Sequence, residues 1–172
     1  MSGLVDSAVL EFGAASPLGK ISMPALWFED CTVGALHAHP IRRTVTEADN
    51  IFFSALTYNP QPLHIDREFC KASEWGQPLM NSLFTLGLMI GISVNDLTTG
   101  TIVANLGMTE VKFPAPLFQG DTINVTTRIA SKRESKSRGD AGIVEFEHRA
   151  FKQDGTLVAH CLRQVMVKKR PL

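Results

Sequence analysis

The sequence predicts an α+β fold in which one antiparallel sheet wraps around a single apolar helix. Residues from Leu79 to about Val94 are apolar nearly all round, and a helix without a polar face is usually buried. From residue 102 onward, strand-like runs separated by short turns replace the helical pattern. At 172 residues, the chain has the length of one such domain.

The chain begins with a segment of little periodicity. Residues 1–25 contain scattered Gly, Ser and Pro, and we expect them to form an arm on the surface or on a partner subunit. The domain itself is expected to cover residues 26–172. Its first strand is expected near residues 26–28 or 41–45.

A helix is expected to start after Thr46, because Thr46 and Asp49 have the spacing of a helix cap. The apolar residues that follow at helical spacing predict a buried face made by Ile51, Phe52, Ala55 and Leu56. Further along the chain, Asp66 is placed to cap a second short helix.

The apolar helix is expected to start at Pro78, since proline is well tolerated at the first helical position. Gly87 and Gly91 lie four residues apart, so another backbone could approach that side of the helix closely. The helix therefore has a candidate contact face in addition to the face that packs on its own sheet.

Four strands are expected after the helix, at residues 102–113, 121–133, 142–153 and 156–168. The dipeptide Asp154-Gly155 is a strong signal for a short hairpin between the last two. A sheet that encloses one apolar helix is the hotdog arrangement. Because such a sheet has exposed edges, we expect a homodimer or a higher homo-oligomer built from dimers.

Composition narrows the choice of partners and compartment. With 17 basic and 17 acidic residues the net charge is zero, so we expect no nucleic-acid partner, and no apolar run is long enough to predict a membrane span. The three cysteines lack metal-site or disulfide spacing, and Met1–Lys20 lacks a signal-peptide pattern, which favours the cytoplasm. His37 and His39 have no carboxylate or cysteine nearby, so no metal site is expected.

The most informative segment runs from Thr57 to His64. Pro60 and Pro62 restrict its backbone, so the loop is built to hold one shape. A stiff polar loop that ends in histidine is a common way to present a general acid–base group, because imidazole titrates near neutral pH. The alternative is that His64 is a hydrogen-bonded turn residue without a catalytic role.

Four segments together resemble the MaoC-like dehydratases, the (R)-specific enoyl-CoA hydratase group of hotdog proteins. The resemblance covers roughly residues 28–168. It rests on Thr44-Val45-Thr46-Glu47-Ala48-Asp49, on the loop Leu56–His64 with Ile65-Asp66, on the helix at Gly76–Leu88, and on Phe113-Pro114-Ala115-Pro116-Leu117-Phe118-Gln119-Gly120-Asp121-Thr122. The last segment is typical of the family pattern Phe-x-x-Pro-x-x-x-Gly-Asp-Thr.

The resemblance implies a site for adding water to an enoyl-CoA, with the CoA thioester as substrate and no separate cofactor. In the family loop Gly-Asp-x-Asn-Pro-x-His, the Asp and the His flank the water; here Asn59 and Gln61 stand where the family has Asp and Asn. A backbone amide near the start of the central helix holds the thioester oxygen. The matching positions are Asn81 and Ser82, which makes the Ser82 amide the expected oxyanion donor.

Asn59 is the main departure from the family, because an amide cannot accept a proton as a base. Three interpretations remain open. Asn59 orients the water while His64 transfers the protons; or a carboxylate such as Asp49 or Asp66 acts as base, although both are also placed to cap helices; or catalysis is lost and the chain only binds acyl-CoA.

The chain looks closest to a subgroup with Asn-Pro-Gln-Pro-Leu-His loops, similar to hydratases of branched dicarboxylic thioesters such as mesaconyl-CoA or itaconyl-CoA. A neutral Asn59 would accept a substrate carboxylate that an aspartate would repel. Arg42 and Arg43 are candidate carboxylate partners, and equally candidates for simple surface residues. Candidates for the CoA phosphates are Arg133, Lys136 and Arg138, in a turn that is alternatively only solvated.

Two rival functions use the same fold. A hotdog thioesterase usually carries an acidic residue on the central helix, and residues 79–94 contain none. A non-catalytic acyl-CoA-binding protein stays open because of Asn59.

Overall fold

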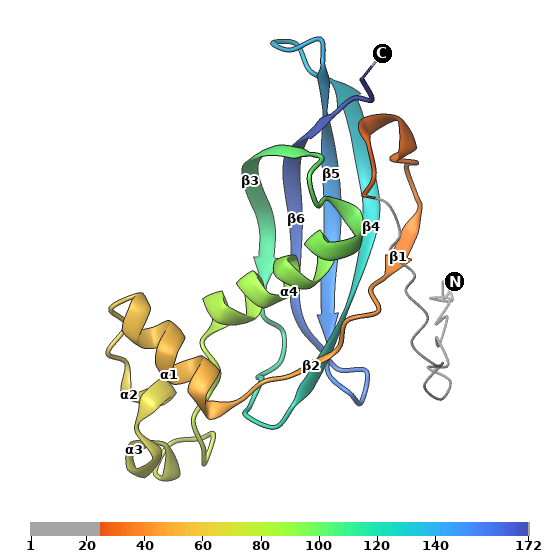
Figure 1. Ribbon diagram of the computed structural model, residues 1–172. Coiled ribbons are helices and arrows are strands. Elements are labelled where there is room, and N and C mark those ends of the chain that lie inside the picture. Colours follow the sequence, from red (N-terminus) through yellow and green to blue (C-terminus); the bar gives the residue numbers. More distant parts are fainter. Residues whose placement is uncertain (1–24, 172) are drawn as a thin grey trace, which may run out of the picture.

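The structure is a computed structural model that describes residues 25–171. A curved antiparallel sheet holds one long helix, and a group of short helices projects to the side (Figure 1). Apart from its last residue, the arm predicted over residues 1–25 lies outside the described residues. Within them, no helix has the length and apolar character needed to cross a membrane.

The six-stranded sheet has the order β1-β4-β5-β6-β3, and β2 pairs with β4 at one end. All of these pairs are antiparallel. The strands are β1 Leu36–Ala38, β2 Arg43–Thr44, β3 Ile102–Lys112, β4 Thr122–Glu134, β5 Ala141–Phe151 and β6 Leu157–Lys168. The four long strands confirm the predicted ones to within two residues at each end.

The turn between β5 and β6 confirms the predicted hairpin. Gly155 has a φ of +85°, a conformation that glycine adopts without strain. The Asp154 carboxylate accepts a hydrogen bond of 2.9 Å from the Thr156 amide, which closes the turn. Of the two positions expected for the first strand, residues 41–45 are confirmed by β2, whereas residues 28–30 form a short 3-10 helix. Strand β1, at Leu36–Ala38, was not predicted.

The long helix α4, Ser82–Leu97, starts later than Pro78. The residues before it are extended, since the Met80 amide donates to the Leu117 oxygen at 2.9 Å. The Asn81 side chain then caps the first turn. Pairing with a neighbouring segment and a good cap residue together outweigh the preference of Pro78 for the first helical position.

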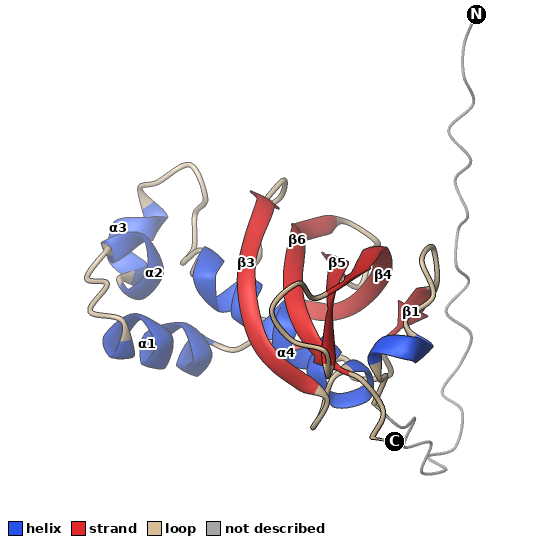
Figure 2. Ribbon diagram, turned by 90° about the horizontal axis from the view of Figure 1, so that it is seen from above, coloured by secondary structure: helices blue, strands red, loops and turns tan. Residues whose placement is uncertain are grey.

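Helix α4 crosses the concave face of the sheet (Figures 1 and 2). Met89 and Ile92 on its inner side are buried in a core shared with β4, β5 and β6. The opposite side of α4, which includes the contact face predicted at Gly87 and Gly91, is left uncovered by this chain. Leu83, Gly87, Gly91 and Asn95, spaced four apart, form an exposed line on its outer side.

Three short helices precede α4 and stand beside the sheet rather than on it (Figure 1). They are α1 Glu47–Leu56, α2 Pro62–Ile65 and α3 Arg67–Lys71. The predicted caps are confirmed: the Thr46 side chain accepts from the Asp49 amide at the start of α1, and the Asp66 side chain accepts from two amides at the start of α3.

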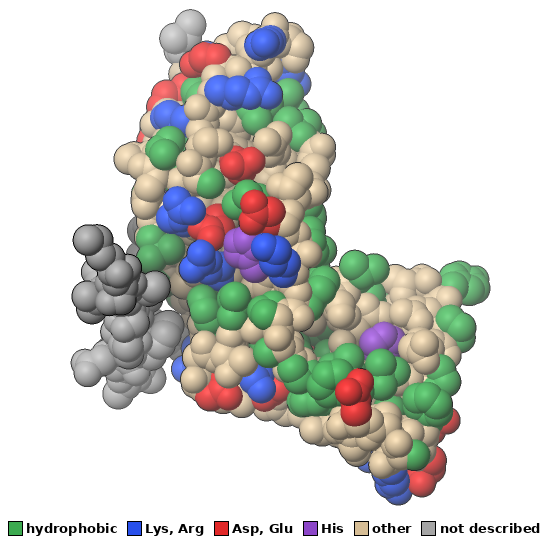
Figure 3. Space-filling model, turned by 180° about the vertical axis from the view of Figure 1, so that it is seen from behind, with side chains coloured by type: hydrophobic (Ala, Val, Ile, Leu, Met, Phe, Trp, Pro, Cys, Tyr) green, Lys and Arg blue, Asp and Glu red, His purple; other side chains and the backbone are tan. Residues whose placement is uncertain are grey.

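The burial predicted for α1 is wrong. Phe52 is 68% exposed and Leu56 is 81% exposed, whereas Asn50 and Ser54 are each 2% exposed. The inner face of α1 is polar because it meets backbone groups of α2 and of the segment leading to α4. Its apolar face therefore turns outward. Figure 3 shows hydrophobic side chains gathered on the part of the molecule that projects beside the sheet.

Candidate active site

The loop between α1 and α2 has a defined conformation. Tyr58 adopts a φ of 53°, which is uncommon for a residue other than glycine. The Asn59 amide donates to the Ser54 oxygen at 2.9 Å, and the Asn59 side-chain oxygen accepts from the Gln61 amide at 3.1 Å. Pro62 then opens α2, the single turn that carries His64. As predicted, the loop is tightly constrained by local bonds.

His64 is partly buried, and its ring is fixed by the main chain. Its Nδ1 lies 2.8 Å from the Leu79 oxygen. Because a carbonyl oxygen can only accept, Nδ1 carries the hydrogen in this bond. In the neutral ring, Nε2 then carries no hydrogen and its lone pair is free to accept a proton. A general base requires this arrangement.

Asn50 joins His64 to the start of α4. Its side-chain nitrogen donates to the His64 oxygen at 2.7 Å and to the Leu79 oxygen at 3.0 Å, and its oxygen accepts from the Asn81 amide at 2.8 Å. The sequence analysis missed this residue. The available signal was a pair of polar residues, Asn50 and Ser54, four apart in the part of the helix where the other residues are apolar.

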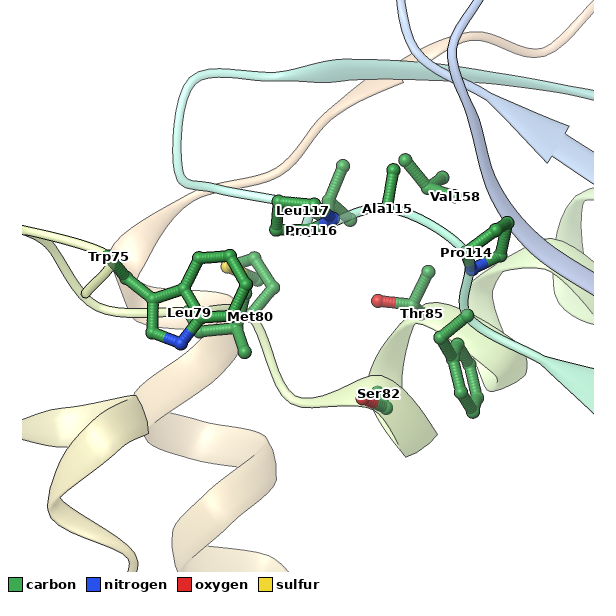
Figure 4. Close-up of a pocket in the computed structure, with 11 residues that line it drawn as sticks. Trp75, Leu79, Met80, Ser82, Thr85, Pro114, Ala115, Pro116, Leu117 and Val158 are labelled. Atoms are coloured by element: carbon green, nitrogen blue, oxygen red, sulfur yellow. The ribbon is translucent and has the colours of Figure 1, made fainter. Parts of the chain in front are cut away.

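Ser82 is the first residue of α4, and its amide belongs to the helix terminus, where backbone donors lack partners inside the helix. Ser82 lines a pocket of about 180 Å³. Figure 4 shows Ser82 and Thr85 on one side of this pocket and the segment Pro114–Leu117 on the other. The remaining lining residues are mainly apolar: Trp75, Leu79, Met80, Phe113 and Val158.

The other predicted loop and helix residues are placed differently. Asn81 is 4% exposed, and its side chain is used to cap α4. Gln61 is exposed. Asn59 borders a second apolar hollow, next to Tyr58, rather than the pocket at Ser82. The structure bonds the His64 ring to Leu79, three residues before α4, but His64 is not among the residues that line the pocket at Ser82. Within the described residues, Asn59 has no hydrogen bond to His64.

The carboxylates considered as alternative bases are both helix caps. Asp49 accepts from the Thr46 amide and hydroxyl and forms an ion pair with Arg43. Partial burial raises the pKa of Asp49, but the bonds from Arg43 and Thr46 outweigh it and hold this pKa below its usual value. Asp66 caps α3. A carboxylate held ionised by a cap and an arginine is a weaker proton acceptor.

The two arginines before α1 differ in their surroundings. Arg43 is neutralised by Asp49. Arg42 is exposed and forms no ion pair with any residue in the described range. Arg42 is thus the one of the pair whose charge is available to a ligand.

The basic turn lies far from the other candidates in the same chain. Arg133, Lys136 and Arg138 are all exposed at the tip of the β4–β5 hairpin, at the opposite end of the sheet from α1–α3 (Figure 1). Arg138 is paired with Asp140 at 2.6 Å. One chain does not bring this turn together with His64.

His39 has a carboxylate partner that the sequence did not reveal. Its Nδ1 lies 2.8 Å from Asp96 in the last turn of α4, and its Nε2 lies 2.8 Å from the Thr127 hydroxyl, which also contacts His148. Burial lowers the pKa of His148 to about 3.

Within residues 25–171, no group of three or more His, Cys, Asp or Glu side chains is arranged to hold a metal ion.

Comparison with known proteins identifies relatives over most of the described residues. Residues 32–149 match the family described as MaoC like domain. A curated relative, the mesaconyl-CoA hydratase of Cereibacter sphaeroides, is 32% identical over 144 residues. These residues are 84% of this chain and 41% of the relative, so the chain spans well under half of that protein.

Solved structures of MaoC-like and hotdog proteins are also similar to this chain. The MaoC-like dehydratase from Rhodospirillum rubrum is 29% identical, with a TM-score of 0.76 over 86% of this chain and 100% of that one. A Mycobacterium tuberculosis protein with a double hotdog fold also has a TM-score of 0.76, over 86% of this chain and 45% of that one; at 20% identity it supports the fold alone. With both the sheet-and-helix architecture and the family match in place, the chain belongs to the MaoC-like domain family and has the hotdog fold.

Proposed function

We propose that this protein catalyses the reversible addition of water to a 2-enoyl-CoA thioester. The observation that carries the proposal is the 2.8 Å contact between His64 Nδ1 and the Leu79 oxygen, which leaves Nε2 as the free lone pair. Membership of the MaoC-like family and the pocket beside Ser82 support it.

In the proposed reaction, His64 Nε2 takes a proton from a water molecule. The water oxygen bonds to C3 of the substrate, and the electrons of the C2=C3 double bond move onto the thioester oxygen. The imidazolium then returns the proton to C2. Because one histidine handles the proton in both steps, hydrogen and hydroxyl add to the same face.

The Ser82 amide is the proposed partner of the enolate oxygen. A donor at the start of a helix is aided by the helix dipole, which favours negative charge there. Thr85 and Ser82 both face the same pocket, so a thioester bound in it would lie at the helix terminus. Water addition transfers no electrons to or from the substrate, and the proposal therefore includes no cofactor beyond the CoA thioester itself.

Within this function we propose a branched dicarboxylic substrate. The relative from Cereibacter sphaeroides is named a mesaconyl-CoA hydratase. In this chain the loop position of the family aspartate is the neutral Asn59, and Arg42 is exposed without an ion-pair partner in residues 25–171. A second carboxylate on the substrate would meet no repulsion at Asn59 and would find a cation at Arg42.

We also propose that the active form is a homodimer. The exposed line on α4 that contains Gly87 and Gly91 and the exposed apolar face of α1 are both surfaces that one chain leaves uncovered. At both glycines an added Cβ would meet no described atom within 4 Å, so there is room for a second helix. Strand β3 is an open edge of the sheet as well.

One alternative has a specific observation in its favour. The Asn59 side chain is an amide, which cannot act as a base, and its oxygen holds the Gln61 amide in the loop at 3.1 Å. A chain that only binds acyl-CoA is therefore the second candidate. The thioesterase alternative has less support. Helix α4 carries one acidic residue, Asp96, and its carboxylate is bound to His39 at the far end of the helix from Ser82.

A panel of CoA thioesters tests the proposal. Crotonyl-, mesaconyl- and itaconyl-CoA are each mixed with the protein, and the absorbance of the enoyl-thioester band is followed together with free thiol. A hydratase lowers the band without releasing thiol. A thioesterase releases thiol, and a binding protein changes neither signal although it retains the ligand on gel filtration.

A further inference from the structure

One buried side chain on α1 is hydrogen-bonded to both halves of the candidate site. Asn50 is 2% exposed, and each of its polar atoms is engaged. Its Nδ2 donates to the oxygens of His64 and Leu79, and its Oδ1 accepts from the Asn81 amide. Three bonds of 2.7 to 3.0 Å from one amide are close to the most that such a side chain makes.

The bond to Leu79 bears directly on the imidazole. The Leu79 oxygen accepts from His64 Nδ1 at 2.8 Å and from Asn50 Nδ2 at 3.0 Å. A carbonyl oxygen has two lone pairs, and these two donors use both of them. Asn50 therefore fixes the direction of the peptide group that holds the histidine ring, and its second bond fixes the backbone of His64 itself.

The bond to Asn81 bears on the other half of the site. The Asn81 amide, held by Asn50 Oδ1 at 2.8 Å, precedes the Ser82 amide in the chain. The Asn81 side chain is at the same time committed to the Leu83 amide. Asn50, a residue of α1, thus holds the peptide between Met80 and Asn81, which is one peptide before the one that carries the Ser82 amide.

We infer that Asn50 is a positioning residue, which sets the separation between the His64 imidazole and the Ser82 amide. The inference rests on the proposed hydratase function. It says how the proposed acid–base group, His64, and the proposed oxyanion donor, the Ser82 amide, are held at a fixed position relative to each other. Asn50 itself touches no reacting atom. Small misplacements of groups that act together cost up to about a hundredfold in rate, so its loss is expected to lower kcat far more than it changes KM.

Two variants and one control separate this role from simple packing. Asn50→Ala removes all three bonds. Asn50→Asp keeps the shape and the acceptor for the Asn81 amide but loses both donors. Ser54→Ala is the matched control, because Ser54 lies one turn further along α1, is equally buried, and has a hydroxyl without a partner in the described part of the chain.

We expect Asn50→Ala to lower kcat by roughly tenfold to a hundredfold with KM within about threefold of wild type, and Ser54→Ala to leave both unchanged. The ratio of Asn50→Asp to wild-type activity is expected to rise as pH falls, because a protonated carboxyl regains one donor. Folded Asn50 variants with wild-type kcat, or a ratio that does not change with pH, would overturn the inference.

A measurement that needs no turnover keeps the two proposals distinguishable. Nitrogen NMR of isotopically labelled histidine reports which ring nitrogen of His64 carries the hydrogen. Wild type should show the Nδ1–H form, and Asn50→Ala a measurable share of the Nε2–H form. If wild type is inert on every thioester, the hydratase proposal fails while this spectrum still decides the role of Asn50; an unchanged spectrum in the variant refutes it.

Discussion

The Nδ1 atom of His64 lies 2.8 Å from the main-chain oxygen of Leu79, across 15 positions of the sequence. This contact places an imidazole with a free Nε2 next to the segment that leads into α4. The loop alone could present a histidine, but only the pairing with Leu79 defines which ring nitrogen is available. The predictions below follow from this contact and from its neighbours.

Ser82→Pro is expected to remove the oxyanion donor without breaking the helix. Ser82 is the first residue of α4, where proline is tolerated, and Asn81 before it has the extended ψ of 126° that a following proline requires. We expect kcat to fall by about 10²- to 10³-fold. Ser82→Ala keeps the amide and should retain activity. A fully active Ser82→Pro enzyme would exclude this amide as the donor.

Asn59→Asp should change which substrate is preferred. A negative charge near a substrate carboxylate costs on the order of one to a few kcal/mol at an effective dielectric constant near 20. The variant should therefore lose activity on mesaconyl- or itaconyl-CoA relative to crotonyl-CoA, measured as kcat/KM for each. A wild-type preference for crotonyl-CoA, with a variant faster on every substrate, would contradict the dicarboxylate proposal.

The assembly can be tested by light scattering at micromolar concentration. Wild type should have at least twice the chain mass of 18.8 kDa. Gly91→Gln has room in the single chain and suits a helix better than glycine, so it should keep the fold while weakening the dimer. Gly139→Gln, in the β4–β5 turn, also has open space and serves as control. A wild-type protein that is monomeric and active would rule out the proposed interface.

His148 should make the fold less stable in mild acid. Burial lowers its pKa from 6.5 to about 3, so between these values the unfolded chain binds a proton that the folded chain does not. This contribution to stability is complete above pH 6.5 and is lost as pH falls toward 3, at up to about 1.4 kcal/mol per pH unit. Urea unfolding of His148→Gln should show a shallower decline over this range than wild type. Equal slopes would mean that folding does not lower the pKa of His148.

Much of the sheet could be predicted because its signals are local. Alternating strands and the turn at Asp154-Gly155 depend on residues next to each other in the chain, and the cap at Thr46 spans only three positions. The structure agrees closely with the sequence in these places. The family resemblance rested on similarly local segments, and residues 32–149 match that family.

The predictions that were wrong concern which part of the chain each side of a helix packs against. Helical spacing identified the apolar face of α1, but its inner face packs on backbone oxygens, so Asn50 is buried and Phe52 is not. The pairing of His39 with Asp96 joins residues 57 positions apart, and no local pattern predicts it. Long-range contacts of this kind decide burial and hydrogen bonding, and they link the loop to α4.

Replacement of His64 by glutamine tests the central claim most directly. His64→Gln keeps a polar side chain of similar size but cannot cycle a proton. Hydration of the best thioester should fall by at least two to three orders of magnitude, the usual contribution of a positioned acid–base group, while circular dichroism and thioester binding stay close to wild type. A folded His64→Gln protein that hydrates the thioester at the wild-type rate would show that the imidazole is not the acid–base group.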